Sequence, residues 1–147
     1  LVVPETAVAA LTKLAQNLFI SPSTPAQYAA ISAFNTDAMS IHKQRRGVFE
    51  DRAKILAEGL LELGFRIPVM PDGAFYLYVD ISHTKMDSAD FCWRLIEEYK
   101  VAATPGYDFG DSNAGQYVRF AYTTSEESIL LGLERIGTAL KDWGLQA

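Results

Sequence analysis

Hydrophobic residues recur at helical spacing through the first part of the chain. Residues 5–17 carry apolar positions three to four apart, which predicts an amphipathic helix. A second helix is expected to end near Phe34. Its start is marked by Thr24 and Gln27, which have the spacing of a capping box, with Pro25 at the first helical position.

A longer helix is predicted from Thr36 to Leu63. Its apolar positions recur at sevens with further apolar residues beside them, and Gly64 is placed to end it. A helix of this length is typical of a bridge between two bodies. We therefore expect residues 1–34 to belong to a larger neighbouring domain and residues 35–147 to form a small domain that includes the long helix.

The hydrophobic pattern changes period after the long helix, and four short strands are expected. Each is rich in β-branched or aromatic residues and is bounded by turn-forming residues. The first contains a proline, which cannot donate to a ladder, so it is expected at a sheet edge. The four segments are 65–69, 74–81, 101–104 and 117–122.

Two further amphipathic helices are predicted among these strands. One begins at Asp87 or Ser88, between the second strand and the third. The other follows the last strand, where Thr124 and Glu127 form a second capping box. Short strands with helices on one side indicate an α+β fold. We expect a small antiparallel or mixed sheet with helices packed on one face, preceded by the long bridging helix.

Composition narrows the classes of function. A hydrophobic content of 49% and a charged content of 21% are those of an ordinary globular protein. The net charge of −5 argues against nucleic acid as a partner, because phosphate binding requires a concentrated basic surface. No apolar run reaches the length of a membrane span. Cys92 is the only cysteine, which excludes an internal disulfide and fits a cytoplasmic origin.

The last predicted strand holds the most informative charged residue. Alternation places Arg119 on the side opposite an apolar face. That face consists of Val118, Phe120 and Tyr122. An arginine in mid-strand must be exposed or paired with an anion, and its planar fork of donors matches a carboxylate. From these residues alone, a structural ion pair and a ligand site both remain open. No nucleotide-binding glycine motif or Cys/His metal spacing is present.

Three segments carry a family resemblance. They are Pro71-Asp72-Gly73-Ala74-Phe75-Tyr76-Leu77, then Val101-Ala102-Ala103-Thr104-Pro105-Gly106 with Phe109-Gly110, then Tyr117-Val118-Arg119-Phe120-Ala121-Tyr122. In this order, with the helix between them and the closing helix, they resemble the C-terminal part of class I/II pyridoxal-phosphate-dependent aminotransferases. Residues 1–5 look like the strand after the family's cofactor-lysine loop, and residues 19–27 look like its cleft-lining loop. The chain begins at Leu1 inside that strand, so we expect an excised piece.

The resemblance implies a fold type I enzyme that uses pyridoxal 5'-phosphate. Such enzymes are normally cytoplasmic homodimers with active sites between the subunits. Their small domain supplies the arginine that binds the substrate α-carboxylate, and Arg119 stands at that position. Phe75, after the Pro-x-Gly turn, matches an aromatic residue near the substrate; a core aromatic is the alternative reading.

The resemblance also implies a catalytic lysine, which forms the Schiff base with the cofactor from a Ser-Lys loop. None of the six lysines of this chain has that context. The Schiff-base lysine is therefore expected outside this chain, and the chain alone is expected to be inactive. The aspartate that pairs with the pyridine nitrogen is also expected upstream.

Transamination between an amino acid and a 2-oxo acid is the favoured activity of the parent protein. Another fold type I reaction, such as carbon–sulfur lysis, would use the same carboxylate clamp. A third reading is the effector-sensing domain of a transcription regulator with an aminotransferase-like fold. A fourth is an α+β interaction module without a ligand. No metal ion is expected under any of these readings.

Overall fold

The computed structural model of the chain describes residues 2–145 and divides into two compact units. The first unit is Leu1–Gln44 and the second is Arg45–Ala147. The two units are defined by the contacts that residues of this chain make with one another. The domain boundary expected between residues 34 and 35 concerns the parent protein and stays a prediction.

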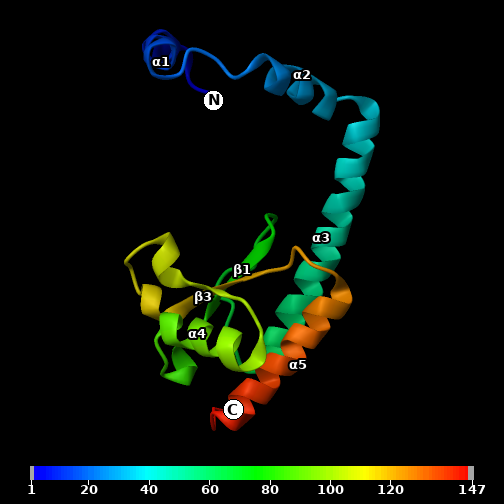
Figure 1. Cartoon of the computed structure of the whole chain (residues 1–147), viewed down its shortest axis with the longest axis vertical. Helices are drawn as coiled ribbons and strands as arrows, with labels where there is room; N and C mark the ends of the chain where they lie inside the picture. The colour runs from blue at the N-terminus through cyan, green and yellow to red at the C-terminus, as the bar shows by residue number, and fades with distance from the viewer. Residues whose placement is uncertain (1, 146–147) are drawn as a thin grey trace. The chain divides into compact units, whose positions relative to one another are not determined.

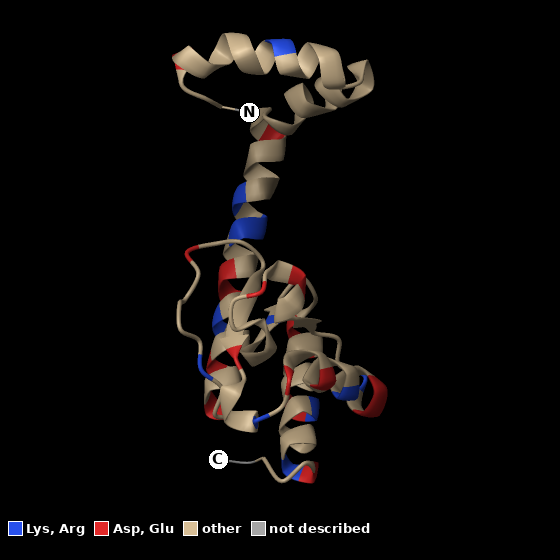
Figure 2. Ribbon diagram, turned by 90° about the vertical axis from the view of Figure 1, so that its left-hand side faces the viewer, with Lys and Arg blue, Asp and Glu red and all other residues tan. Residues whose placement is uncertain are grey.

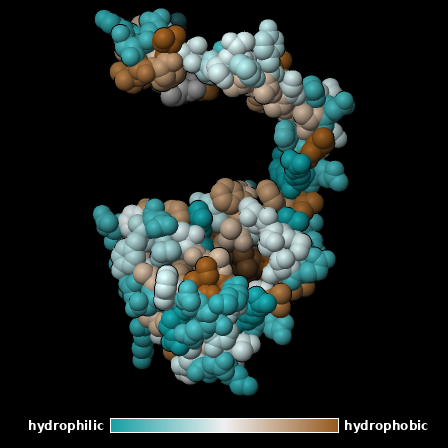
Figure 3. Space-filling view, in the orientation of Figure 1, coloured by the Kyte–Doolittle hydropathy of each residue, from teal (hydrophilic) through white to brown (hydrophobic). Residues whose placement is uncertain are grey.

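The first unit begins with two helices, as predicted. They are α1 (Glu5–Leu18) and α2 (Thr24–Ala33), and neither contains a buried residue. Figure 3 shows hydrophobic residues at the surface of this unit. Large apolar side chains such as Leu18 of α1 and Ile31 of α2 are each 71% exposed. Within residues 2–145, these helices therefore lack the covering that an amphipathic helix normally has.

Two predictions for the first unit are wrong in detail. Residues 2–4 do not form the end of a strand, and Val2 is fully exposed; Leu1 lies outside the described residues. The capping box at the start of α2 does not form. Ser23 is the N-cap and its side chain makes no capping hydrogen bond. Gln27 Nε2 instead donates to the carbonyl of Pro22 at 2.8 Å.

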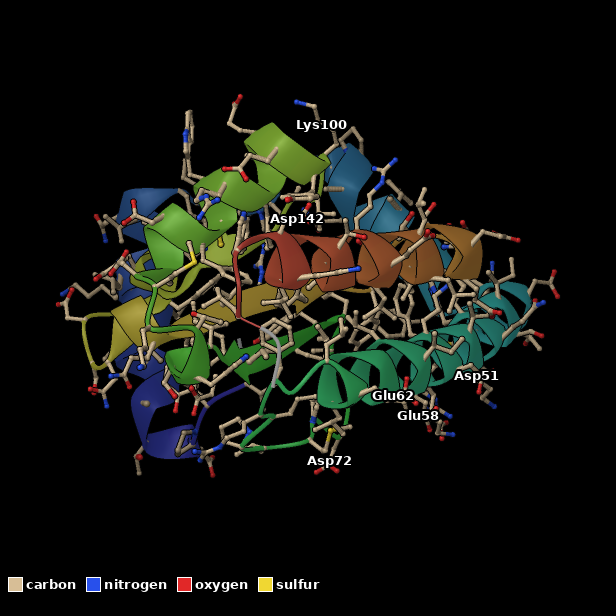
Figure 4. The ribbon with its side chains drawn as sticks, turned by 90° about the horizontal axis from the view of Figure 1, so that it is seen from below. Asp51, Glu58, Glu62, Asp72, Lys100 and Asp142 are labelled. Atoms are coloured by element: carbon tan, nitrogen blue, oxygen red, sulfur yellow. The ribbon has the colours of Figure 1, made fainter. Side chains whose placement is uncertain are left out.

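Helix α3 (Thr36–Glu62) matches the long predicted helix and continues into the second unit. Gly64 ends it in a left-handed conformation with φ of 85°, and the amide of Phe65 donates to the carbonyl of Leu60. The buried residues of α3 are Leu56, Ala57 and Leu60. Its carboxylates Asp51, Glu58 and Glu62 project from the side that faces away from α5 (Figure 4). The second half of α3 is therefore amphipathic.

The sheet of the second unit is antiparallel and has three strands in the described residues. These are β1 (Tyr76–Asp80), β2 (Thr104–Pro105) and β3 (Tyr117–Ala121), in the order β1-β3-β2. Figure 1 labels β1 and β3. The strand predicted at 65–69 is wrong: only one isolated bridge, between Arg66 and Asp80, forms there. The strand predicted at 101–104 is also wrong in extent, because only its last residue joins the sheet.

Helices α4 (Ser88–Tyr99) and α5 (Glu126–Asp142) complete the second unit. Asp87 caps α4, as predicted, by accepting a hydrogen bond from the amide of Ala89 at 2.9 Å. The capping box predicted at Thr124 does not form, because the N-cap lies one residue later. Ser125 is the N-cap of α5, and its hydroxyl accepts from the amide of Ser128. Short 3₁₀ turns occupy the remaining connections; they are Ser82–Thr84, Gly106–Phe109 and Ala114–Gln116.

One hydrophobic core joins the sheet to α3, α4 and α5. The inward residues of β1 and β3 meet apolar residues from all three helices in this core. Phe65 contacts Phe91 and Phe120 edge-on, with ring centroids 6.0 and 6.4 Å apart. The helices therefore cover one face of the sheet. The predicted α+β fold with helices on one face is confirmed.

Candidate carboxylate-binding site

Arg119 lies at the centre of the three-stranded sheet. In the antiparallel register it stands opposite Tyr78 of β1 and opposite Thr104 of β2. Its chain neighbours Val118 and Phe120 are 0% and 4% exposed, whereas Arg119 itself is partly exposed. The predicted alternation is therefore confirmed. The Arg119 side chain lies on the sheet face opposite the helices.

The guanidinium group of Arg119 is only partly hydrogen-bonded within the described chain. Nη2 donates to Thr104 Oγ1 at 3.1 Å, whereas Nε is buried and has no partner among residues 2–145. A buried donor without a partner costs about 1–3 kcal/mol, so the guanidinium group keeps unused hydrogen-bonding capacity within the described chain. The ion pairs of the described residues involve other cations; they are Lys54–Glu50, Arg66–Asp80 and Arg94–Glu98. A structural ion pair of Arg119 within this part of the chain is therefore excluded.

Aromatic rings surround this guanidinium group. Its central carbon lies 4.9 Å from the ring centre of Phe109 and 5.6 Å from that of Tyr76. Tyr78 stacks on Tyr117 with 5.0 Å between ring centres. The pKa of Tyr78 is raised, mainly because the side chain is partly buried and to a lesser extent because Tyr117 is close. Rings at these distances attract the cation and exclude water from its faces. The guanidinium group therefore has cation–π contacts with two rings, one from β1 and one from the turn after β2.

The segment that carries Phe109 is held against the sheet and α4. Gly106 is buried, and a Cβ atom there would lie only 2.9 Å from the backbone carbonyl of Tyr117. Tyr107 Oη donates to Asp87 Oδ2 at 2.7 Å. This hydrogen bond, with burial and the charge of Asp87, raises the pKa of Tyr107. Close packing and the tyrosine hydrogen bond thus fix the turn that positions Phe109.

Phe75 lies beside the site rather than in the core. Its side chain is 43% exposed, which excludes the core reading. Its ring contacts Tyr76 edge-on with centroids 5.4 Å apart, and its backbone carbonyl accepts from the amide of Tyr122 at 2.9 Å. Phe75 therefore contacts Tyr76, which in turn contacts Arg119, and contact of Phe75 with a substrate stays a prediction.

The other residues with reactive side chains lie apart from Arg119. All six lysines are exposed: Lys13, Lys43, Lys54, Lys85, Lys100 and Lys141. Cys92 is 7% exposed, and burial raises the pKa of its thiol to about 12, which makes it unreactive. The ring of His83 packs edge-on against Phe65 with centroids 5.0 Å apart.

Charge distribution, metal-ligating residues and helix hydropathy in the described residues bear on other functional classes. Basic and acidic residues are interspersed along the ribbon of the second unit (Figure 2). No cluster of metal-ligating side chains occurs in residues 2–145, and none of their helices has the length and hydropathy of a membrane span. A cavity of about 310 Å³ lies between α5 and residues 100–102, and Arg119 does not line it.

Sequence reasoning found Arg119 but not its neighbours. Thr104, Phe109 and Tyr76 all lie in the segments that carry the resemblance, but no pattern in the sequence places them beside Arg119. The contact between Thr104 and Arg119 depends on strand register, which the short β2 segment does not encode by a hydrophobic pattern. The Thr-Pro-Gly sequence at 104–106 was the available signal, because it marks where the chain enters and leaves the sheet edge.

Comparison with known proteins places this geometry in a family. The model of the family described as aminotransferase class I and II matches residues 1–136. The (5-formylfuran-3-yl)methyl phosphate transaminase of Methanocaldococcus jannaschii is 36% identical over 129 residues, which cover 88% of this chain and 34% of that protein. The valine–pyruvate aminotransferase of Mycobacterium tuberculosis is 34% identical over 140 residues, covering 95% of this chain and 36% of that protein. The chain spans about a third of the length of these relatives.

Solved structures show the same relationship. An aminotransferase from Mycobacterium tuberculosis superposes with a TM-score of 0.87 at 34% identity, covering 95% of this chain and 36% of that chain. An aromatic aminotransferase from Pyrococcus horikoshii superposes with a TM-score of 0.84 at 32% identity, covering 97% and 38%. The three segments that carried the resemblance lie within the matched region. The chain therefore belongs to the class I and II aminotransferase family, as a region of about a third of the length of its relatives.

Proposed function

We propose that this chain supplies the substrate-carboxylate site of a pyridoxal-phosphate-dependent aminotransferase. The parent enzyme would move an amino group between an amino acid and a 2-oxo acid. The observation that carries the proposal is the Arg119 guanidinium, which has a buried donor without a partner and lies among aromatic rings. The names of the relatives favour transamination over other reactions of the fold, because they are transaminases or aminotransferases.

Arg119 would bind and orient the α-carboxylate in this proposal. Its planar fork offers two parallel N–H donors to the two carboxylate oxygens. Phe109 and Tyr76 would limit the access of water to the cation, which strengthens the pairing. Both an amino acid and a 2-oxo acid carry this carboxylate, so one group would hold both substrates of the reaction in turn.

The parent assembly follows from the same proposal. Residues 1–34 would be the tail of the large cofactor-binding domain, and residues 35–147 the small domain. A cytoplasmic homodimer is the proposed state of the parent protein. The exposed apolar side chains of α1 and α2 support this, because surfaces of this kind are usually covered by another domain or subunit. They include Leu14 and Leu18 of α1 and Tyr28 and Ile31 of α2.

The residues of this chain do not fit the role of holding pyridoxal phosphate covalently. That role requires a buried lysine with a lowered pKa, and all six lysines are exposed. The lysine and the main cofactor contacts would therefore come from residues outside this chain. We infer that the chain by itself does not catalyse transamination.

Covalent trapping tests this inference. We expect the isolated chain, titrated with pyridoxal phosphate and reduced with borohydride, to show low labelling that is scattered over several exposed lysines. Peptide mapping by mass spectrometry would measure the distribution. Stoichiometric labelling of a single lysine would contradict the inference.

Replacement of Arg119 tests the proposed site in the full-length protein. The substrate would be the amino acid with the highest turnover in a screen of the common amino acids. Arg119→Lys keeps the positive charge but loses the planar fork. Each charge-assisted hydrogen bond contributes about 1.5–3 kcal/mol, so kcat/KM for this amino acid is expected to fall by about ten-fold or more. Arg135→Lys is the matched control, because Arg135 lies on α5, on the helix-covered side of the sheet, and is not a partner of Arg119.

A second substrate separates binding of the carboxylate from other effects. The amine formed by removing the carboxylate from the same amino acid is expected to react poorly with wild type and equally poorly with Arg119→Lys. Cofactor absorbance and thermal unfolding would show that the variant folds and is loaded. If Arg119→Lys handled the amino acid like wild type, or failed to fold, Arg119 would be a structural residue.

A further inference from the structure

We propose that Thr104 is a positioning residue that fixes the guanidinium group of Arg119 for the carboxylate. This inference rests on the proposed role of Arg119 and adds a residue to it. Thr104 would not touch the substrate itself. Its hydroxyl would instead hold the arginine in the one orientation that presents a free edge of donors.

The strand register places Thr104 beside Arg119. Thr104 is the first residue of β2 and pairs directly with Arg119 of β3. Side chains of directly paired residues project from the same face of an antiparallel sheet, with Cβ atoms about 4.5–5.5 Å apart. The Thr104 hydroxyl accepts the hydrogen bond from Arg119 Nη2 at 3.1 Å. This contact is therefore a consequence of the sheet and does not depend on a mobile loop.

Thr104 is itself held in a narrow range of conformations. Its branched Cβ restricts χ1, and the following Pro105 restricts its backbone to the extended region. Thr104 is also only partly exposed. A hydrogen bond to such a rigid acceptor restricts the conformations of the long arginine side chain.

The hydrogen bond leaves a defined set of Arg119 donors for a ligand. Nη2 donates one proton to Thr104, and Nε is buried without a partner in the described chain, so the remaining protons of Nη1 and Nη2 are the donors that a ligand would meet. Phe109 and Tyr76 lie within 5.6 Å of the guanidinium carbon. The rings limit tilting of the guanidinium plane, and Thr104 limits rotation within that plane. The two constraints together pre-organise the group, which lowers the entropy cost of binding a carboxylate.

The full-length protein offers a direct test with two variants at this position. Thr104→Val has nearly the same shape but lacks the acceptor, whereas Thr104→Ser keeps the hydroxyl. Thr124→Val is the matched control, because Thr124 is exposed and makes no side-chain hydrogen bond within residues 2–145. The probes are the amino acid with the highest turnover and the amine formed by removing its carboxylate.

We expect Thr104→Val to raise KM for the amino acid by about three- to ten-fold, as loss of order in one long side chain implies. We expect kcat to stay within about two-fold, because ground state and transition state use the carboxylate contact equally. Thr104→Ser should restore KM, and the control should match wild type. In an Arg119→Lys background, Thr104→Val should add little, because the oriented fork is already lost.

Three results would overturn the proposal and can be told apart. If Thr104→Val leaves KM unchanged while Arg119→Lys weakens it, Thr104 does not position Arg119 and the proposed carboxylate site stands. If Arg119→Lys has no effect either, the proposed function fails and this inference fails with it. An equal loss for the amino acid and the amine, tracking a loss of thermal stability, would show that Thr104 is only structural.

Discussion

Gly106 lies where the backbone of the loop after β2 approaches the sheet most closely. A Cβ atom added there would lie 2.8 Å from Tyr78 Oη and 2.9 Å from the backbone carbonyl of Tyr117, and the carbonyl of Ala114 is its nearest neighbour. Two of these three atoms belong to the backbone, so a side-chain rotation cannot relieve the contact. Gly106→Ala must therefore displace the loop or the end of β3.

The size of the effect follows from this geometry. Overpacking in a close-packed region costs about 1–3 kcal/mol. Replacing glycine by alanine also removes freedom from the unfolded chain, which offsets about 0.4–1 kcal/mol. We expect a net loss of about 1–2 kcal/mol in the free energy of unfolding. Because Phe109 lies in the same turn and over Arg119, carboxylate binding by the full-length protein should also weaken.

Urea unfolding of the 147-residue chain, followed by tryptophan fluorescence, measures the stability part. Trp143 is a suitable reporter, because it packs against Phe91 and Tyr99 in the second unit. Gly132→Ala is the matched control, since Gly132 lies within α5 and no atom approaches its added Cβ within 4 Å. That control should gain about 0.5–1 kcal/mol from helix propensity. A Gly106→Ala chain as stable as wild type would refute the close-approach reasoning.

Two further outcomes are expected from the core of the second unit. Leu60→Ala should lower the free energy of unfolding by about 2–5 kcal/mol, because Leu60 is 0% exposed. Its neighbour Leu61 is 51% exposed and should tolerate alanine. Equal losses of the two variants in urea unfolding would contradict this core assignment. Burial raises the pKa of the Cys92 thiol from 9.0 to about 12, so the folded state holds this proton longer and its stability falls as pH rises from 9 towards 12. Cys92→Ala lacks this dependence, so its stability relative to wild type should improve over that range, and a constant difference would count against the buried thiol.

The helices were predictable from sequence because hydrophobic spacing and end signals agree there. Gly64 is the example: its left-handed conformation ends α3 within one residue of the expected position. The strand expected at 65–69 failed for a local reason. Arg66 and Asp80 exchange both backbone hydrogen bonds, and the next such pair would join residue 68 to Tyr78. Pro68 has no N–H to donate, so the ladder stops after one bridge.

The strand expected at 101–104 does not form over its full length, because its first residue hydrogen-bonds to the preceding helix. Lys100 adopts a left-handed conformation at the end of α4, and the amide of Val101 donates to the carbonyl of Leu95 at 3.1 Å. Val101 therefore completes the helix end, and the chain reaches the sheet only at Thr104. A window of β-branched residues does not reveal this competition for the same amide.

The sequence predicted the position of Arg119 in the candidate site, but it did not predict which residues surround Arg119. Period-two alternation is a local property, so it placed Arg119 on the correct face of β3. The neighbours Thr104, Tyr76 and Phe109 come from other segments, and their proximity depends on register and on a tight turn. The unpaired Nε donor is likewise visible only in three dimensions.

A crystal structure of the full-length protein with a bound 2-oxo acid or unreactive amino-acid analogue tests the central claim most directly. The account predicts that both carboxylate oxygens accept hydrogen bonds from Arg119, with nitrogen–oxygen distances of about 2.7–2.9 Å. Thr104 Oγ1 should remain bonded to Nη2, as in the unliganded chain. A carboxylate bound by other residues, with Arg119 paired to a carboxylate of the protein, would contradict the account.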